Sequence, residues 1–403
     1  MPVVSIEKAK ALISDFILED KGTQIDKFVL GNEKYTKFVN EFWTAKQRQA
    51  NSIHEISYRA CYKPQLPRFF IDIFTKENDV VYDPFAGRGT TLIEAGLMGR
   101  NIVSNDVNPL SKILTIPRLD IPTINQIEQR LDEIVFEKVE ADIDVSMFFH
   151  KDTELEIVSL KNQLTDSAVD NWIRMVATNR LTGHSSGFFS GYTLPPNQAA
   201  SQRRQKLINK RLGIVPSYKN TKEIIIKKSK SLMRNINSDL SRRLEDVSST
   251  AIFSSLDSRK TNHISSDSVH LTVTSPPFLN IVRYAEDNWL RSWFNGIDAS
   301  KIESKISSCR TVDNWSNIMS GVFSELYRVT VPGGWVAFEV GEVNNGKIKL
   351  DEHVIPLGIS SGFICAGVMV NSQDFTKTSN IWGVENMKIG TNTNRIVLFH
   401  KSK

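Results

Sequence analysis

Two separate stretches of the chain alternate short apolar runs with segments of helical periodicity. In the first stretch, an apolar run at residues 79–82 is followed by a helix-like segment at 92–98, which Gly99 ends. A second apolar run at 101–104 comes directly after that glycine. This order predicts a β-α-β unit, in which a helix joins two parallel strands.

The second stretch lies towards the C-terminus and repeats the alternation. Its pattern predicts strands at 268–274, 334–340, 363–370 and 395–400, and helices at 289–294 and 315–327. Strands that alternate with helices on both sides of a middle region are typical of an α/β fold. We therefore predict one doubly wound, mostly parallel sheet that is interrupted by an inserted, mostly helical module.

The middle region concentrates the positive charge of the chain. The whole sequence has 50 Lys and Arg against 45 Asp and Glu, a formal net charge of only +5. Residues 199–236 contain eleven Lys or Arg and a single acid, Glu223. A solvated helical face is one interpretation, but so asymmetric a block favours a surface that follows a nucleic-acid backbone. The candidate nucleic-acid-contacting residues are His184, Arg203, Arg204, Lys206, Lys210 and Arg211.

Composition and motif searches exclude several other classes of protein. The longest apolar runs fall well short of the ~20 residues that a membrane span needs, so we expect no membrane association. The N-terminus lacks the layout of a secretory signal, and we therefore expect a cytoplasmic protein. Three cysteines without a Cys-x-x-Cys pair predict neither disulfides nor a metal site.

A glycine-containing string follows the first predicted strand. Residues 83–91 read Asp-Pro-Phe-Ala-Gly-Arg-Gly-Thr-Thr, and Gly87 and Gly89 allow the backbone to approach a ligand and turn into a helix. No lysine follows Gly89, so the string is not a Walker phosphate loop. Asp106 follows the second strand, where an acid can accept hydrogen bonds from both ribose hydroxyls. Capping of the next turn is the structural alternative for Asp106.

A second string, Thr-Ser-Pro-Pro-Phe at 274–278, follows the strand predicted at 268–274. The two prolines fix the backbone, so the carbonyl groups of Ser275 and Pro276 are held rigidly where the strand ends. Such carbonyls are suited to accept hydrogen bonds from an exocyclic amino group, and Phe278 offers a face for base stacking. The structural alternative is a strand-ending turn with a core phenylalanine.

Together the two strings resemble motif I and motif IV of the S-adenosylmethionine-dependent DNA amino-methyltransferases, whose catalytic motif reads Asp/Asn/Ser-Pro-Pro-Tyr/Phe. Further similarities are Lys63-Pro64 upstream of the first strand, Asp257 in Leu-Asp-Ser, and the turn at 328–334. The resemblance covers residues ~50 to 120 and ~250 to 400. It implies S-adenosyl-L-methionine as cofactor and the seven-stranded, Rossmann-like sheet of class I methyltransferases.

The resemblance also implies roles for individual residues. The catalytic motif would be Ser275, Pro276, Pro277 and Phe278, and the cofactor site would comprise Lys63, Pro64, Asp83, Pro84, Phe85, Ala86, Gly87, Gly89, Thr90, Thr91, Asp106 and Asp257. The expected domains are an N-terminal helical extension at 1–50, a catalytic domain at 51–120 and 250–403, and a target-recognition insertion at 121–249.

The family's chemistry implies methyl transfer to the N4 amino group of cytosine in double-stranded DNA, by base flipping and direct transfer. A restriction-modification system is the expected setting, with a cognate endonuclease that acts separately. The Ser form of the motif is commonest among cytosine-N4 enzymes, but Phe278 replaces the more usual Tyr and the glycine string precedes the catalytic motif. That order differs from the commonest cytosine-N4 arrangement.

Three other functions remain open at this point. Adenine-N6 methylation uses the same chemistry, and RNA base methylation uses similar motifs. The third alternative is a DNA-binding module without enzymatic activity, in which neither string would have a function. Cytosine-C5 methylation is excluded because it requires a Pro-Cys nucleophile, whereas Cys61, Cys309 and Cys365 each follow another residue.

Overall fold

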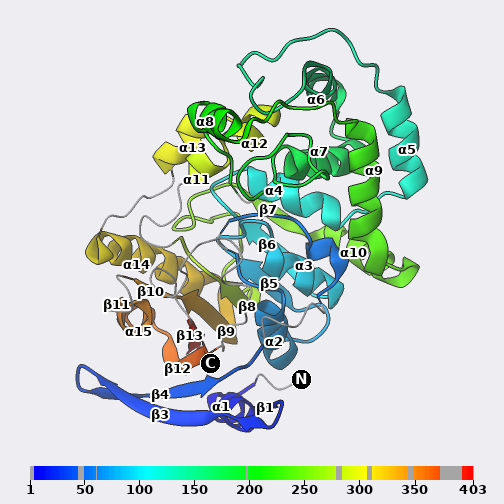
Figure 1. Cartoon of the computed structure of the whole chain (residues 1–403). Helices are drawn as coiled ribbons and strands as arrows, with labels where there is room; N and C mark the ends of the chain where they lie inside the picture. The colour runs from blue at the N-terminus through cyan, green and yellow to red at the C-terminus, as the bar shows by residue number, and fades with distance from the viewer. Residues whose placement is uncertain are drawn as a thin grey trace.

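A central sheet with helices on both faces runs through the molecule (Figure 1). The computed structural model describes residues 4–43, 50–59, 61–196, 198–277, 284–305, 311–343, 348–372 and 393–402. Within these residues the sheet has nine strands in the order β3-β4-β12-β13-β9-β8-β5-β6-β7.

The middle of the sheet is parallel. It comprises β5 (Val80–Asp83), β6 (Asn101–Asn105), β7 (Ile252–Ser254), β8 (Val269–Thr274) and β9 (Thr330–Val340). The strands β12 (Ile364–Ser372) and β13 (Thr393–His400) form an antiparallel pair, and β13 lies between β12 and β9. All six predicted strands are confirmed, with shifts of a few residues at their ends, whereas β7 was not predicted.

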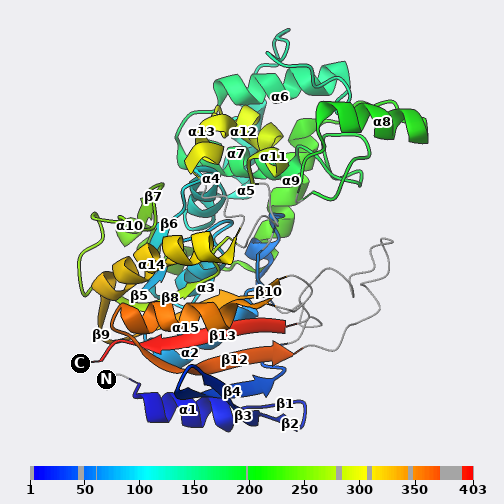
Figure 2. The ribbon, with the colours of Figure 1, turned by 90° about the vertical axis from the view of Figure 1, so that its left-hand side faces the viewer.

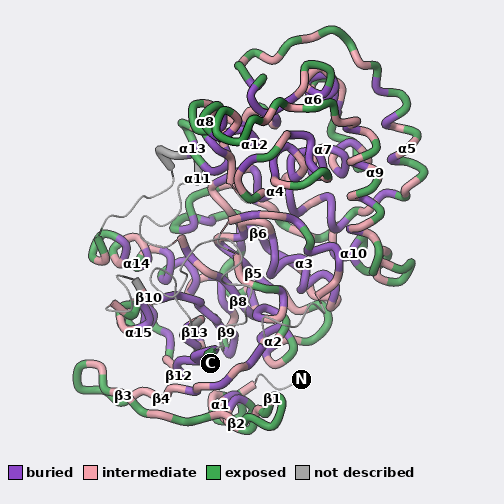
Figure 3. Tube along the Cα trace, in the orientation of Figure 1, coloured by how far each residue is buried: buried purple, intermediate pink, exposed green. Residues whose placement is uncertain are grey.

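Helices cover both faces of the sheet (Figure 2). The helices α2 (Gln65–Phe74), α3 (Thr90–Leu97) and α10 (Ser238–Thr250) pack on one face, and α14 (Val312–Val329) and α15 (Leu350–Ser360) pack on the other. The strand β9 is therefore buried along almost its whole length (Figure 3), which explains its nearly continuous apolar sequence. The doubly wound arrangement predicted from the sequence is confirmed.

The N-terminal region differs from the helical extension that we expected. After α1 (Ile6–Ser14) it contains a small pair, β1 (Ile17–Leu18) and β2 (Lys21–Gly22), and a hairpin of β3 (Gln24–Leu30) and β4 (Glu33–Asn40). The strand β4 pairs in parallel with β12, so the hairpin extends the expected seven strands to nine. Alternation of apolar and polar residues around Gly31-Asn32 is the hairpin signal that was overlooked.

The chain between β6 and β7 carries the inserted helices. After α4 (Leu110–Thr115), it forms α5 (Ile124–Glu133), α6 (Lys151–Gln163), α7 (Ala168–Arg180), α8 (Gln202–Leu212) and α9 (Thr221–Leu232) before α10. In this segment, short 3₁₀ turns lie at Ile116–Arg118 and Met233–Asn235, and another lies before β5 at Ser52–His54. The predicted helical character of the insertion is confirmed over the described residues.

A second excursion, after β8, joins this helical region. It contains α11 (Tyr284–Asp287), α12 (Trp289–Phe294) and α13 (Ala299–Lys305), and both views place it beside α7 and α8 (Figures 1 and 2). The Trp289 indole N–H donates to the carbonyl of Ala200 at 3.0 Å, and the Trp289 and Phe148 rings lie 5.9 Å apart. The helix predicted at 289–294 thus exists, but it packs on the insertion. A small pair, β10 (Glu342–Val343) and β11 (Ile348–Lys349), precedes α15.

None of the helices in the described ranges is both long and apolar enough to cross a bilayer.

Candidate cofactor and methyl-transfer site

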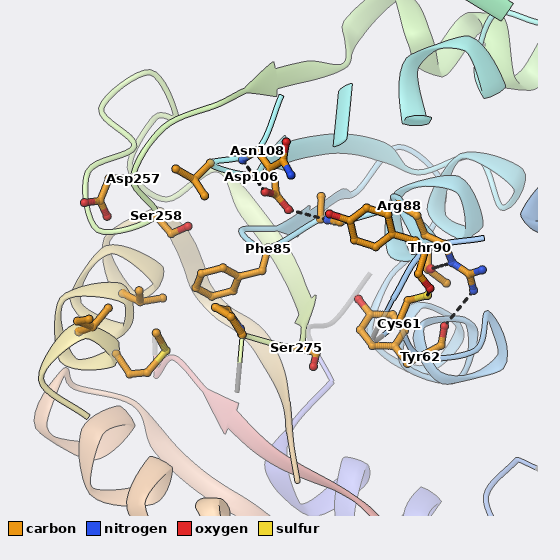
Figure 4. Close-up of a pocket in the computed structure, with 18 of the residues that line it drawn as sticks. Cys61, Tyr62, Phe85, Arg88, Thr90, Asp106, Asn108, Asp257, Ser258 and Ser275 are labelled. Carbon is orange, nitrogen blue, oxygen red and sulfur yellow. Dashed lines mark hydrogen bonds between the residues drawn. The ribbon is translucent and has the colours of Figure 1, made fainter. Parts of the chain in front are cut away.

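A cavity opens where the parallel strands end (Figure 4). The loops that follow β5, β6, β7 and β8 all reach it, as expected for ligand binding at the carboxyl edge of a doubly wound sheet. Eight predicted residues line it: Phe85, Ala86, Gly87, Thr90, Asp106, Asp257, Ser275 and Pro277. Both motifs recognised in the sequence therefore face one cavity.

The glycine loop is held by a buried carboxylate beneath the cavity. Asp83, the last residue of β5, accepts hydrogen bonds from the Thr274 hydroxyl at 2.6 Å and the Tyr62 hydroxyl at 3.0 Å. It also accepts the backbone N–H of Phe85 at 3.1 Å. Burial raises the pKa of Asp83 to about 6, although these hydrogen bonds act in the opposite direction. Asp83 thus ties β5 to the end of β8 instead of lining the cavity.

Gly87 and Gly89 both adopt positive φ angles, 52° and 75°. Gly89 precedes the first residue of α3, and a Cβ atom there would lie 2.3 Å from the Thr115 hydroxyl oxygen. Only glycine therefore fits this turn without displacing α4. The close turn directs the N-terminal end of α3 towards the cavity.

Asp106 connects the loops after β5 and β6. Its carboxylate accepts the backbone N–H of Gly87 at 2.7 Å and that of Asn108 at 2.8 Å, as the dashed lines in Figure 4 show. Burial raises the pKa of Asp106 to about 6, despite these two donors. A carboxylate has about four acceptor positions, so two backbone donors leave capacity for the hydroxyls of a bound ribose.

Asp257 lies on the far side of the cavity, in the loop after β7. It forms an ion pair with Arg259 at 2.6 Å, and this hydrogen-bonded partner lowers the pKa of Asp257. Asn105 secures the loop by donating to the carbonyl of Leu256 at 2.9 Å. Asp257 is therefore ionised, with Arg259 bound to both of its carboxylate oxygens.

The Ser-Pro-Pro string follows β8 directly. Ser275 and Pro277 line the cavity, Pro276 is buried, and the Trp315 indole N–H donates to the carbonyl of Pro277 at 3.0 Å. Trp315 belongs to α14, so this bond ties the string to the face of the sheet that α14 covers. Phe278 lies outside the described residues, and its stacking role stays a prediction.

The segment before α2 contributes differently from our expectation. Tyr58, Cys61 and Tyr62 line the cavity, whereas Lys63 and Pro64 are not among the lining residues. Arg88 fixes this segment by donating to the carbonyl of Ile56 at 2.7 Å and to that of Tyr62 at 3.3 Å. Contact of Lys63 or Pro64 with the cofactor stays a prediction.

Four other predicted cofactor residues, Asp83, Pro84, Gly89 and Thr91, support the loop without lining the cavity. Sequence reasoning missed the apolar wall from α14, which comprises Trp315, Ile318, Met319 and Val322. Their spacing fits one helical face, but the same spacing also occurs in core-facing helices, so the sequence offered no separate signal.

Comparisons with known proteins agree with this geometry. The family model described as DNA methylase matches residues 7–112. A type II methyltransferase of Kocuria varians (M.MvaI) is 32% identical over 95 residues, which cover 23% of this chain and 20% of that protein. Another, from Geobacillus stearothermophilus (M.BsoBI), is 24% identical over 389 residues, 81% of this chain and 74% of that protein.

Over residues 7–112 the chain thus matches a DNA methylase family, and it is similar to type II methyltransferases, most of which it covers over less than two thirds of their length.

A tRNA (guanine(10)-N2)-dimethyltransferase of Methanocaldococcus jannaschii is also similar, with 31% identity over 131 residues. That alignment covers 28% of this chain and only 36% of the relative's length. A solved rRNA methyltransferase of Streptomyces viridochromogenes aligns with 87% of this chain and 89% of its own at 11% identity, but the TM-score is 0.36 and supports no inference. The observed strand order is the class I methyltransferase arrangement with a hairpin added.

The basic insertion carries less unpaired positive charge than its sequence indicates. Lys206 pairs with Asp144 at 2.9 Å, Lys230 with Glu128 at 2.8 Å, and Arg234 with Glu55 at 2.9 Å. Acids distant in the sequence thus neutralise part of the block. The exposed cations of α8 that form no ion pair within the described residues are Arg203, Arg204, Lys210 and Arg211, while the predicted His184 lies half-buried in the loop after α7.

In the ranges that the structure describes, no cluster of His, Cys, Asp or Glu side chains could hold a metal ion.

Proposed function

We propose that this chain transfers a methyl group from S-adenosyl-L-methionine to the N4 amino group of cytosine in duplex DNA. The observation that carries the proposal is that Ser275 and Pro277 line the same cavity as Asp106 and Gly87. The first pair comes from the string expected to hold a target amino group. The second pair comes from the loops expected to hold the cofactor.

The cavity suits the cofactor chemically. Asp106 has free acceptor positions for ribose hydroxyls, Asp257 is an ionised acceptor for an adenine amino group, and Phe85 provides a flat apolar face between them (Figure 4). When bound there, S-adenosylmethionine would supply an electrophilic methyl group. The loops after β5, β6 and β7 would orient it, and the wall from α14 would exclude water.

The residues after β8 would prepare the target. The exocyclic amino nitrogen of cytosine is a poor nucleophile because its lone pair is delocalised into the ring. Acceptance of its two N–H hydrogens by the Ser275 hydroxyl oxygen and the Pro276 carbonyl would favour a pyramidal nitrogen whose lone pair points at the methyl group. Since a duplex hides this nitrogen, the cytosine would first leave the helix, and Phe278 would stack against it.

The choice of cytosine over adenine rests on the serine of the motif. Mass analysis of nucleosides from the DNA of a host that expresses the chain distinguishes the two products directly. N4-methylcytosine would support the proposal, whereas N6-methyladenine would show that the same mechanism acts on adenine. The similarity to type II methyltransferases supports a protective role beside a separate endonuclease.

RNA is the second candidate substrate, favoured by the tRNA dimethyltransferase relative. That alignment covers a limited part of both chains, and the chain carries an exposed basic helix that fits a phosphate backbone of either kind. Assays with duplex DNA and with transfer RNA of matched concentration separate these substrates, because methyl incorporation would occur in only one of them.

Replacement of Arg203, Arg204, Lys210 and Arg211 by alanine should weaken duplex binding and flatten its dependence on salt. Each phosphate that the variant no longer neutralises should reduce the slope of log affinity against log salt by roughly 0.9. Duplex affinity measured at several salt concentrations from about 50 to 200 mM checks the predicted slope. The control is Lys230→Ala, which removes an exposed cation already paired with Glu128. Equal slopes for the quadruple variant and the wild type would show that α8 does not contact DNA.

A further inference from the structure

A buried carboxylate that the mechanism above does not use lies beside the catalytic string. Glu339 is the penultimate residue of β9 and only 7% exposed, within a strand that is otherwise almost entirely apolar. Burial of a carboxylate costs free energy unless hydrogen-bond donors surround it, so the donors that contact Glu339 indicate what role it has there. Burial raises the pKa of Glu339, and its partners counteract the effect.

The strand register places Glu339 next to Ser275. The strands β8 and β9 are parallel and pair Thr274 with Phe338. Ser275 and Glu339 are the residues that follow this last pair, so they occupy adjacent positions on the two neighbouring chain segments. Tyr62 and Ser275 both line the cavity (Figure 4).

Two donors reach the Glu339 carboxylate. The Asn394 amide of β13 donates to the Oε1 atom of Glu339, and a side-chain hydrogen bond with Ser275 lowers the pKa of Glu339. A carboxylate only accepts hydrogen bonds, so the Ser275 hydroxyl must be the donor in this pair. Its single hydrogen is then committed to Glu339, and only lone pairs remain on Oγ.

We propose that Glu339 is a positioning residue that holds the Ser275 hydroxyl as a pure hydrogen-bond acceptor towards the target amino group. This proposal rests on the proposed function. Without Glu339 the hydroxyl could rotate and donate its hydrogen to the amino nitrogen. Such a bond would occupy the lone pair that must attack the methyl group, so the geometry of Glu339 excludes the unproductive orientation.

Glu339→Gln tests this directly. Glutamine keeps the shape but has one acceptor oxygen, so Asn394 and Ser275 compete for it, and its amino group would donate to Ser275 Oγ. We expect the single-turnover methylation rate to fall by about ten-fold, the effect of losing one net hydrogen bond. Cofactor affinity and melting temperature should stay near wild type. The control is Glu342→Gln, a carboxylate that pairs with Arg395 at 3.3 Å, which should methylate normally.

A charge swap separates positioning from a structural role. In Glu339→Gln with Asn394→Asp, the new carboxylate accepts the glutamine amino group, which leaves the glutamine oxygen for Ser275. The rate should recover most of the loss. A slow Glu339→Gln that the swap does not rescue, or a Glu339→Gln with the wild-type rate, would overturn the inference.

Ser275→Ala, assayed in parallel, distinguishes the two levels of the account. If Ser275→Ala is slow while Glu339→Gln is as fast as wild type, only the inference about Glu339 fails. If Ser275→Ala itself keeps the wild-type rate, the catalytic assignment fails and the role of Glu339 falls with it.

Discussion

Ser275→Ala should lower the single-turnover rate of methyl transfer by about a hundred-fold, the effect typical of losing one positioned transition-state hydrogen bond. The hydroxyl oxygen is needed chiefly as the amino nitrogen becomes pyramidal and attacks. Its loss should therefore appear in the rate, with affinities for cofactor and duplex nearly preserved. Incorporation of labelled methyl with enzyme in excess measures the rate, and titration calorimetry measures cofactor affinity.

The matched control for this variant is Ser268→Ala. Ser268 immediately precedes β8, at the end of the strand away from the cavity, and its hydroxyl bonds the carbonyl of Ser265 at 2.7 Å. It should leave the rate unchanged. If Ser275→Ala methylates at the wild-type rate, Ser275 is not catalytic and the Pro-Pro turn has only a structural role.

Asp106→Ala should weaken S-adenosylmethionine binding by about ten- to a hundred-fold, as expected when a hydrogen bond to a charged group is removed. The carboxylate also holds the Gly87 and Asn108 amides, so part of the effect would come from a loosened loop. Asp106→Asn keeps the side-chain shape and one of the two acceptor oxygens, so it separates loss of the charge and one acceptor from loss of the whole side chain. Calorimetry checks both variants, and unchanged cofactor affinity in Asp106→Ala would remove this residue from the site.

The pKa of Asp106, about 6 in the folded chain, gives this prediction a pH signature. Below pH 6 the carboxyl is protonated and loses acceptor capacity, so wild-type cofactor affinity should fall as the pH falls through 6. The free energy of unfolding of the ligand-free chain should instead rise as the pH falls through 6. A raised acid pKa means that the folded state binds the proton more tightly than the unfolded state. Asp83 titrates near the same pH, so the part of the dependence that Asp106→Asn removes belongs to Asp106.

Local pattern was sufficient for the centre of the fold. Apart from His270, the strand β8 is a β-branched and apolar run that ends one residue before two prolines, and β5 ends at a Pro-containing glycine loop. Both signals are short-range, so the sequence alone located the strands and the two loops that meet in the cavity. Short β7 carries only three residues and no comparable pattern, which is why it was missed.

The parts that were missed depend on interactions between distant segments. Pairing of Lys206 with Asp144 and of Arg234 with Glu55 joins residues far apart in sequence, and no local charge count reveals it. Glu339 is a similar case, because only the register of β9 against β8 shows that it lies beside Ser275. Sequence motifs therefore identified eight residues that line the cavity, whereas the contacts around them required the fold.

The most direct test of the central claim is transfer of labelled methyl from S-adenosylmethionine to duplex DNA by the purified chain, followed by digestion to nucleosides. The account predicts label in N4-methylcytosine with the wild type and only a trace with Ser275→Ala, whereas transfer RNA stays unlabelled. Label that appears in RNA alone, or DNA label that is equal in both proteins, would contradict it.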